Sequence, residues 1–222
     1  MKQKLAVIFD MDGVIFDSER AVLAVWRDLA EELGLGEIEA VFRRCVGTNK
    51  VRTEEIFRDA FPELDFARFD GEARARFRER WGGGRLPVKP GAASLLSSLR
   101  ERGIPMALAS STESAVVRQE LDEAGLLGFF DELVGGDAVT HSKPDPEIFL
   151  LAAARLGVPP ADCYAVEDSF NGIRAARAAG MHPLMVPDLL PPDGEMEGLA
   201  ETILPDLAAA EKYLLPMENA SR

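Results

Sequence analysis

Short apolar runs recur along the chain and alternate with segments of helical periodicity. A continuous apolar run is typical of a strand that is buried on both faces, as in a parallel sheet. Five such runs predict strands at residues 5–9, 105–109, 132–135, 163–166 and 183–186. Apolar residues at helical spacing predict helices at residues 92–102, 113–124, 148–156 and 172–179. Strands and helices in alternation predict an α/β fold with a doubly wound, mostly parallel sheet.

The stretch between the first two predicted strands interrupts this alternation. It carries only helical patterns, which predict helices at residues 19–33, 38–45, 51–61 and 66–81. The run Gly82-Gly83-Gly84 closes the stretch, and a glycine run is typical of a flexible joint. We therefore expect an all-helical cap at 18–84, inserted into an α/β core formed by 1–17 and 85–222. The length of the insert disfavours the alternative, in which these helices simply pack on one face of the sheet.

Composition and charge narrow the possible functions. The 222 residues are 47% hydrophobic, which excludes a mainly disordered chain. The formal charge of −13 arises from 25 basic and 38 acidic side chains without a basic block, so we expect no nucleic-acid partner. No apolar run approaches the roughly 20 residues of a membrane span, and no signal-peptide pattern opens the chain.

The two cysteines, Cys45 and Cys163, stand far apart and show no metal-binding spacing. This pattern is typical of reduced thiols in a reducing compartment. We therefore expect a cytoplasmic protein without a membrane partner. A monomer is the expected state, with a dimer left open.

Two acidic residues follow the first predicted strand, in the sequence Phe9-Asp10-Met11-Asp12-Gly13. Ligands of open α/β sheets bind at the carboxyl ends of the strands. There Asp10 could attack a substrate or bind a metal, and Asp12 could exchange a proton with the leaving or attacking oxygen. A calcium-binding loop is the alternative, but Val14 and Ile15 stand where such a loop needs oxygen ligands.

Three later segments bring polar side chains to the same edge of the sheet. Ser110 and Ser111 follow the second strand and suit a phosphate oxygen, although serine before a helix is also a common N-cap. Lys143 precedes another helix and could neutralise a phosphate. Glu167 and Asp168 close the fourth strand. Acidic groups that meet at one rim repel unless a cation separates them, and Mg²⁺ is the cation that prefers such oxygen ligands.

These segments resemble, in order, the four motifs of the haloacid dehalogenase superfamily. The matching stretches are Phe-Asp-Met-Asp-Gly-Val at 9–14, Leu-Ala-Ser-Ser at 108–111, Lys-Pro-Asp-Pro at 143–146 and Glu-Asp-Ser at 167–169. Residues 171–181 also resemble the helix that follows the fourth motif. The resemblance covers the core and the position of the inserted cap, and it is to the subfamily of β-phosphoglucomutase and phosphoglycolate phosphatase.

The resemblance implies a Mg²⁺-dependent phosphatase of a small phosphorylated metabolite, with a sugar phosphate as the expected substrate. Asp10 would be the nucleophile that forms an aspartyl-phosphate, and Asp12 would protonate the leaving alcohol and then activate water. Ser110 and Lys143 would hold the phosphoryl oxygens, with Ser111 beside them. Asp10, the backbone carbonyl of Asp12 and the carboxylate of Asp168 would bind Mg²⁺.

Glu167 would complete the metal site, either as a further ligand or from behind the ligands. Two regions outside the four motifs are candidates for substrate contact. Glu19 lies where the core passes into the cap, and Lys50 and Arg52 lie in a Gly-led segment before a cap helix. A plain turn between helices is an equally good interpretation of that segment.

Two other functions remain open. One is a phosphosugar mutase resembling β-phosphoglucomutase, in which a cap histidine matches the position of Val22 here. Valine cannot relay a proton, so hydrolysis is favoured. The other is a catalytically silent binding protein on the same fold, which would have no need for the complete set of Asp10, Asp12, Lys143 and Asp168.

Overall fold

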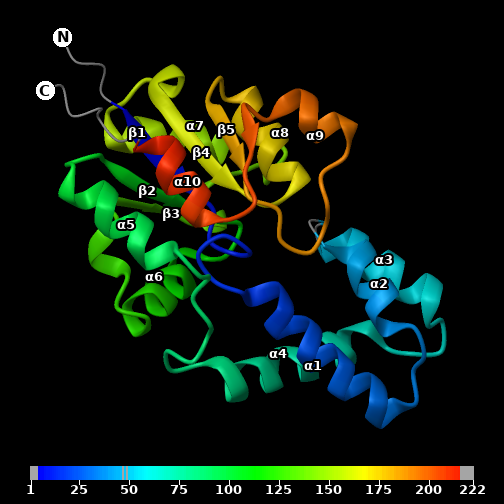
Figure 1. Cartoon of the computed structure of the whole chain (residues 1–222). Helices are drawn as coiled ribbons and strands as arrows, with labels where there is room; N and C mark the ends of the chain where they lie inside the picture. Colours follow the sequence, from blue (N-terminus) through cyan, green and yellow to red (C-terminus); the bar gives the residue numbers. More distant parts are fainter. Residues whose placement is uncertain (1–4, 47, 49, 216–222) are drawn as a thin grey trace, which may run out of the picture.

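A six-stranded sheet forms the centre of the core (Figure 1). The computed structural model describes residues 5–46, 48 and 50–215, without the side chain of Lys50. The strands are β1 (Ala6–Phe9), β2 (Met106–Ala109), β3 (Glu132–Val134), β4 (Cys163–Glu167), β5 (His182–Met185) and β6 (Thr202–Ile203). Their order is β3-β2-β1-β4-β5-β6, and each neighbouring pair is parallel. The predicted doubly wound α/β fold is confirmed.

Helices cover both faces of the sheet because the buried strands are apolar on both sides. In β1, Val7 and Phe9 belong to one apolar cluster, whereas Ala6 and Ile8 belong to another. The core helices are α5 (Ala92–Glu101), α6 (Ser114–Glu123), α7 (Glu147–Leu156), α8 (Phe170–Ala178), α9 (Gly194–Leu199) and α10 (Leu207–Leu214). Residues of α5, α6 and α10 complete the first cluster, and residues of α7 and α8 complete the second.

The sequence analysis did not predict β6, α9 or α10. A strand of two residues and a helix of six are too short for an apolar period to stand out. The eight residues of α10 span only about two turns. Short one-turn helices, η1 (Leu127–Phe129), η2 (Gly136–Ala138) and η3 (Pro160–Asp162), lie in the connections.

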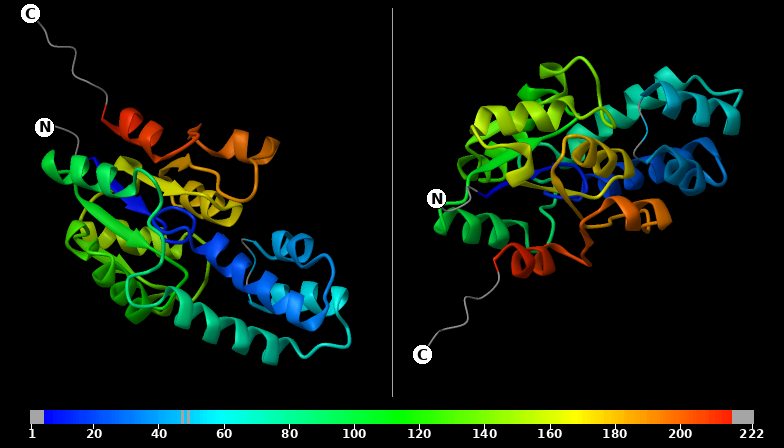
Figure 2. Two further views of the ribbon diagram at one scale, coloured as in Figure 1. Left: turned by 60° about the horizontal axis from the view of Figure 1, so that its bottom comes forward. Right: turned by 90° about the horizontal axis from the view of Figure 1, so that it is seen from above.

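Four helices form a separate group beside the core (Figures 1 and 2). They are α1 (Ser18–Leu33), α2 (Ile38–Cys45), α3 (Lys50–Ala60) and α4 (Phe66–Trp81). Their apolar faces meet around Trp26, whose ring lies edge-to-face with Phe42, Phe57 and Phe69 at centroid distances of 5.2, 5.9 and 5.1 Å. This group therefore has an apolar cluster of its own. The division into core and cap at residues 18 and 84 stays a prediction.

The two linkers that lead into and out of the helical group run side by side. Phe16 and Val88 form an antiparallel bridge. The N–H of Asp17 donates to the carbonyl of Pro87, and the N–H of Lys89 donates to the carbonyl of Ile15, both at 2.8 Å. None of the helices in the described ranges combines the length and the low polarity that crossing a membrane requires.

Candidate active site

The candidate site lies where the order of strands reverses. From β1 the chain proceeds outward to β2 and β3, and it then returns to the other side of β1 to form β4. This reversal is the position at which ligands bind in open α/β sheets, at the carboxyl edge of the sheet. Asp10 follows β1, and Glu167 and Asp168 end or follow β4. One oxygen of each of these three carboxylates lies within 4.8 Å of the others.

Lys143 is the cation at the centre of these acids. Its Nζ donates to Asp10 Oδ1 at 2.5 Å, to Glu167 Oε1 at 2.7 Å and to the carbonyl of Ala109 at 3.0 Å. The exposed fractions of the three charged side chains are 7% for Lys143, 10% for Asp10 and 0% for Glu167. The predicted phosphate-binding lysine thus meets the predicted nucleophile directly, and both side chains are largely buried.

Burial and crowding change the acidity of these groups. Burial raises the pKa of Asp10 to about 7 against the opposing effect of Lys143, and the charges of Glu167 and Asp12 add to the rise. Burial, followed by the charge of Glu167, holds the pKa of Asp168 well above its ordinary value. Burial also works to lower the pKa of Lys143, but Asp10 and Glu167 together raise it. Three acidic residues thus share one lysine, and both burial and their mutual repulsion favour the uncharged forms of Asp10 and Asp168.

Glu167 is held by the loop that follows it. Its Oε2 accepts the N–H of Asp168 and the N–H of Ser169, both at 3.1 Å, and the hydroxyl of Ser169 at 2.9 Å. Since its Oε1 accepts from Lys143, both oxygens of Glu167 are engaged. This arrangement favours a role in which Glu167 positions the ammonium group of Lys143 and does not itself contact the substrate.

Two glycines leave room for these carboxylates. A Cβ at Gly13 would lie 2.1 Å from Asp168 Oδ2, and the positive φ of 77° at Gly13 is also unfavourable for other residues. A Cβ at Gly172, in the first turn of α8, would lie 1.8 Å from Glu167 Cδ. The backbone therefore approaches the acids as closely as only glycine permits.

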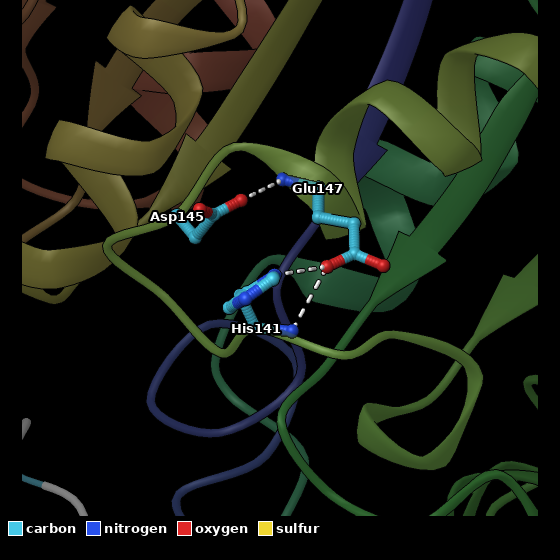
Figure 3. Close-up of side chains that lie close together, drawn as sticks. All are labelled: His141, Asp145 and Glu147. Carbon is cyan, nitrogen blue, oxygen red and sulfur yellow. Dashed lines mark hydrogen bonds and ion pairs between the residues drawn. The ribbon is translucent and has the colours of Figure 1, made fainter.

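A network of hydrogen bonds shapes the loop that carries Lys143 (Figure 3). The Glu147 carboxylate accepts the N–H of Thr140 at 2.9 Å, the N–H of His141 at 2.8 Å and the Nδ1 of His141 at 3.1 Å. Asp145 Oδ1 accepts the N–H of Glu147 at 2.9 Å. His141, although it lies close to the third motif, thus contacts Glu147 and helps to close the loop around Lys143.

The hydroxyl residues after β2 contact Asp12 through Thr112. Thr112 Oγ1 donates to Asp12 Oδ2 at 3.1 Å, and the N–H of Thr112 donates to Ser110 Oγ at 3.0 Å. Ser110 is fully buried, whereas Ser111 is exposed at the rim. The sequence analysis missed Thr112, and its signal was present in the run of three hydroxyl residues, Ser110-Ser111-Thr112, at a strand end.

Of the substrate-contact candidates in the cap, Glu19 lies near the site and Arg52 lies at the surface. Glu19, in the first turn of α1, lies close to the site. Burial raises the pKa of its carboxyl group to about 8, and the negative charges of Asp188, Asp12 and Asp10 add to this rise. Arg52 forms an exposed ion pair with Glu55 at 2.8 Å.

The side chain of Lys50 lies outside the described residues, as do Gly47 and Asn49. Val22, which the sequence analysis aligned with the mutase histidine, packs half-buried against the apolar cluster of the cap.

Asp188 is a second residue that the sequence analysis missed. It follows β5 closely at the same edge of the sheet, and one of its oxygens lies within 4.8 Å of oxygens of Glu19 and Asp168. Its signal was present in the sequence, because this acidic residue stands two positions beyond the strand predicted at 183–186.

The donor set at the edge of the sheet fits a divalent metal ion. Asp10 and Asp168 are buried and offer carboxylate oxygens, which are the ligands that hard cations prefer, and Glu167 lies beside them with both of its oxygens already engaged. Burial, and after it the charges of the neighbouring acids, raises the pKa values of Asp10 and Asp168, and a bound cation would offset that repulsion.

Comparisons with known proteins agree with this chemistry. The family model of haloacid dehalogenase-like hydrolases matches residues 5–180. The chain is 35% identical over 181 residues to the phosphorylated carbohydrates phosphatase of Thermotoga maritima, covering 79% of this chain and 82% of that protein. It is 38% identical over 179 residues to the fructose-1-phosphate phosphatase YqaB of Escherichia coli, covering 79% of this chain and 92% of that protein.

A solved structure extends the comparison to the whole fold. The crystal structure of a HAD family hydrolase from Deinococcus radiodurans, with bound phosphate and sodium, superposes with a TM-score of 0.80 at 27% identity and covers 96% of each chain. Phosphatases of this family generally use a divalent metal ion, and the acids of this site could bind one.

The substitution Gly172→Ala tests how tightly α8 and Glu167 pack. Because the added methyl group would overlap the Glu167 carboxylate, we expect the free energy of unfolding to fall by at least about 2 kcal/mol. In a chain of this size such a loss lowers the thermal midpoint by roughly 4–8 °C. Gly198→Ala in α9 is the matched control, since no atom lies within 4 Å of its added Cβ. Equal midpoints for the two variants would contradict the close approach.

Proposed function

The chain belongs to the haloacid dehalogenase-like hydrolases and is a phosphoric monoester hydrolase, and on this premise we propose that it releases phosphate from a sugar phosphate through an aspartyl-phosphate on Asp10. The observation that carries the proposal is the buried contact of Lys143 with Asp10, beside Asp168. The relatives that act on phosphorylated carbohydrates and on fructose 1-phosphate support the sugar substrate.

The proposed reaction has two displacements at phosphorus. A carboxylate oxygen of Asp10 forms a bond to phosphorus while the bond to the ester oxygen breaks, and Asp12 donates a proton to the departing alkoxide. Asp12, now ionised, then takes a proton from water as the water oxygen attacks the phosphorus of the aspartyl-phosphate. Phosphate leaves, and Asp10 and the protonated Asp12 are restored for the next cycle.

The other residues of the site hold charge and geometry. Lys143 would neutralise phosphoryl oxygens, with the hydroxyl residues after β2 close by, and Glu167 keeps the lysine in place. Asp10, Asp168 and the backbone carbonyl of Asp12 would hold Mg²⁺, which supplies positive charge to the phosphoryl group during transfer. Thr112 holds the carboxylate of Asp12 at the edge of the site.

Replacement of the nucleophile tests the proposal directly. We expect Asp10→Asn to abolish phosphate release from a panel of sugar phosphates, because the amide cannot form the phosphoryl bond, and Asp12→Asn to be severely impaired for lack of a proton donor. The exposed cap residue Asp28 offers a matched control, Asp28→Asn, which should retain parental activity. Activity of Asp10→Asn within a few-fold of the parent would contradict the assignment, and an inactive parent would favour the binding-protein alternative.

Removal of the metal gives an independent test. We expect EDTA to eliminate phosphate release and added Mg²⁺ to restore it, because one lysine cannot neutralise both the clustered acids and the phosphoryl group. Ca²⁺ should support the reaction poorly, since its larger and looser coordination shell holds the reacting groups less well in line. Full activity of the dialysed, metal-free protein would rule out the metal requirement.

Product analysis separates a phosphatase from a mutase. With β-glucose 1-phosphate and a trace of glucose 1,6-bisphosphate, we expect free phosphate and little glucose 6-phosphate. The reason is that Val22, at the position of the mutase histidine, is an apolar residue packed on the cap cluster and cannot relay a proton. Efficient conversion to glucose 6-phosphate without phosphate release would establish the mutase instead.

A further inference from the structure

A histidine at the opposite edge of the sheet from the candidate site takes no part in the proposed reaction. His182 begins β5, so it lies at the edge where the parallel strands start. Its Nδ1 contacts Glu201 Oε2 at 2.5 Å, and its Nε2 contacts the carbonyl oxygen of Ala161 at 2.9 Å. Glu201 directly precedes β6, and Ala161 lies in η3, before β4. One imidazole ring thus joins three segments of the core.

Both partners of this ring are acceptors. An ionised carboxylate and a carbonyl oxygen have no hydrogen to donate, so each contact requires an N–H of the imidazole. A neutral imidazole has one N–H, and it would turn the lone pair of its other nitrogen toward an oxygen. The doubly protonated imidazolium donates to both oxygens. The two contacts of His182 therefore fit its cationic form.

The charges around the ring favour the same form. The hydrogen bond with Glu201 raises the pKa of His182, and the carbonyl of Ala161 adds to the rise, whereas partial burial and the charge of Arg177 oppose it. The hydrogen bond with His182 in turn lowers the pKa of Glu201, which is therefore ionised near neutral pH. The pair is thus a cation and an anion in the folded protein.

Two tyrosines complete the surroundings of this pair. The ring of Tyr164, in β4, lies 5.1 Å from the ring of His182, and the hydroxyl of Tyr213, in α10, donates to Glu201 Oε1 at 3.1 Å. Burial raises the pKa of both phenols, so they stay neutral where histidine titrates. Among the named groups, His182 is therefore the one that changes charge just above neutral pH.

The contact with Glu201 reaches the C-terminal segment of the core. β6 has two residues and is the edge strand of the sheet. The N–H groups of Glu201 and Leu204 donate to carbonyls of β5, each at 2.8 Å. A short edge strand with few hydrogen bonds opens at low cost in free energy. The ion pair at Glu201 therefore lies where β5, β6 and α10 are joined.

We propose that His182 is doubly protonated in the folded protein and acts as a pH-sensitive clamp, which holds β6 and α10 on the sheet and loosens as the pH rises. The inference is independent of the proposed phosphatase function. On deprotonation the ring gives one proton to solvent and keeps a single N–H, so one of its two contacts is lost. The side chains of His182 and Glu201 are 39% and 31% exposed, so water screens the pair and the loosening is modest.

The direction of the pH dependence follows from the raised pKa of His182. Because this pKa is higher in the folded than in the unfolded chain, the folded state binds more protons near neutral pH. The stabilisation is therefore fully present below the ordinary histidine pKa of 6.5, and it is lost as the pH rises through the raised value.

Proton NMR of the imidazole tests the protonation state. In His141→Gln, His182 is the one histidine of the chain, and its titration midpoint should be higher in the folded protein than in the same protein unfolded in urea. Glu201→Gln in this background should lower the folded midpoint, because the amide carries no charge. Glu197→Gln removes an exposed charge of α9 and is the matched control, which should leave the midpoint unchanged. A folded midpoint at or below the unfolded one would overturn the proposal.

Thermal unfolding and hydrogen exchange test the clamp itself. His182→Gln keeps a donor but cannot become charged. The thermal midpoint of the parent should exceed that of this variant at pH 6, and the margin should shrink by about 2–4 °C at pH 9. Over the same range the protection factors of the N–H groups of Glu201 and Leu204 should fall by about fivefold more in the parent than in His182→Gln.

Two results of these measurements would contradict the clamp. A margin between parent and His182→Gln that is the same at pH 6 and pH 9 overturns it, even where the folded titration midpoint is raised. A loss of protection that is as large in β1 and β4 as at the N–H groups of Glu201 and Leu204 reports a general weakening of the core at alkaline pH, and the local clamp then falls.

Discussion

The contact of Lys143 with Asp10 and Glu167 constrains the structure around it. Three chain segments must meet for it to form: the end of β1, the end of β4 and the loop before α7. All three side chains are nearly or fully buried, and removing one partner of a buried ion pair costs about 3–5 kcal/mol, because the remaining charge is left without compensation. The three charged groups must therefore be kept together, because the loss of any one leaves an uncompensated charge inside the core.

The neighbouring backbone follows from this ion group. Gly13 and Gly172 permit the chain to pass within van der Waals reach of Asp168 and Glu167, where any side chain would overlap a carboxylate. On the other side, Glu147 gathers the N–H groups of the loop that presents Lys143. The site is thus built from loops, but each loop is held by hydrogen bonds or close packing against a buried strand end.

The helical group has a different relation to the site. Its aromatic cluster around Trp26 gives it an interior of its own, whose buried members all come from the helical group. Two paired linkers connect it to the core. Asp188 ties both of them to the sheet edge, because it accepts from Arg20, just after the first linker, and from Lys89 in the second. Glu19, in the first turn of α1, lies at this link and close to Asp168 and Asp188.

The sequence by itself determined the α/β alternation, the helical insert and the acids and lysine of the four motifs. These are local signals: apolar runs mark buried strands, and polar residues directly beyond them mark the functional edge of a sheet. Tertiary structure alone decided that Lys143 bridges Asp10 and Glu167, which lie 133 and 24 positions away from it. It also decided that Thr112 holds Asp12 and that Asp188 lies beside Glu19. The physical reason is that periodicity reports which face of an element is buried, whereas contacts between distant side chains depend on strand order, loop course and the close approach that individual glycines allow.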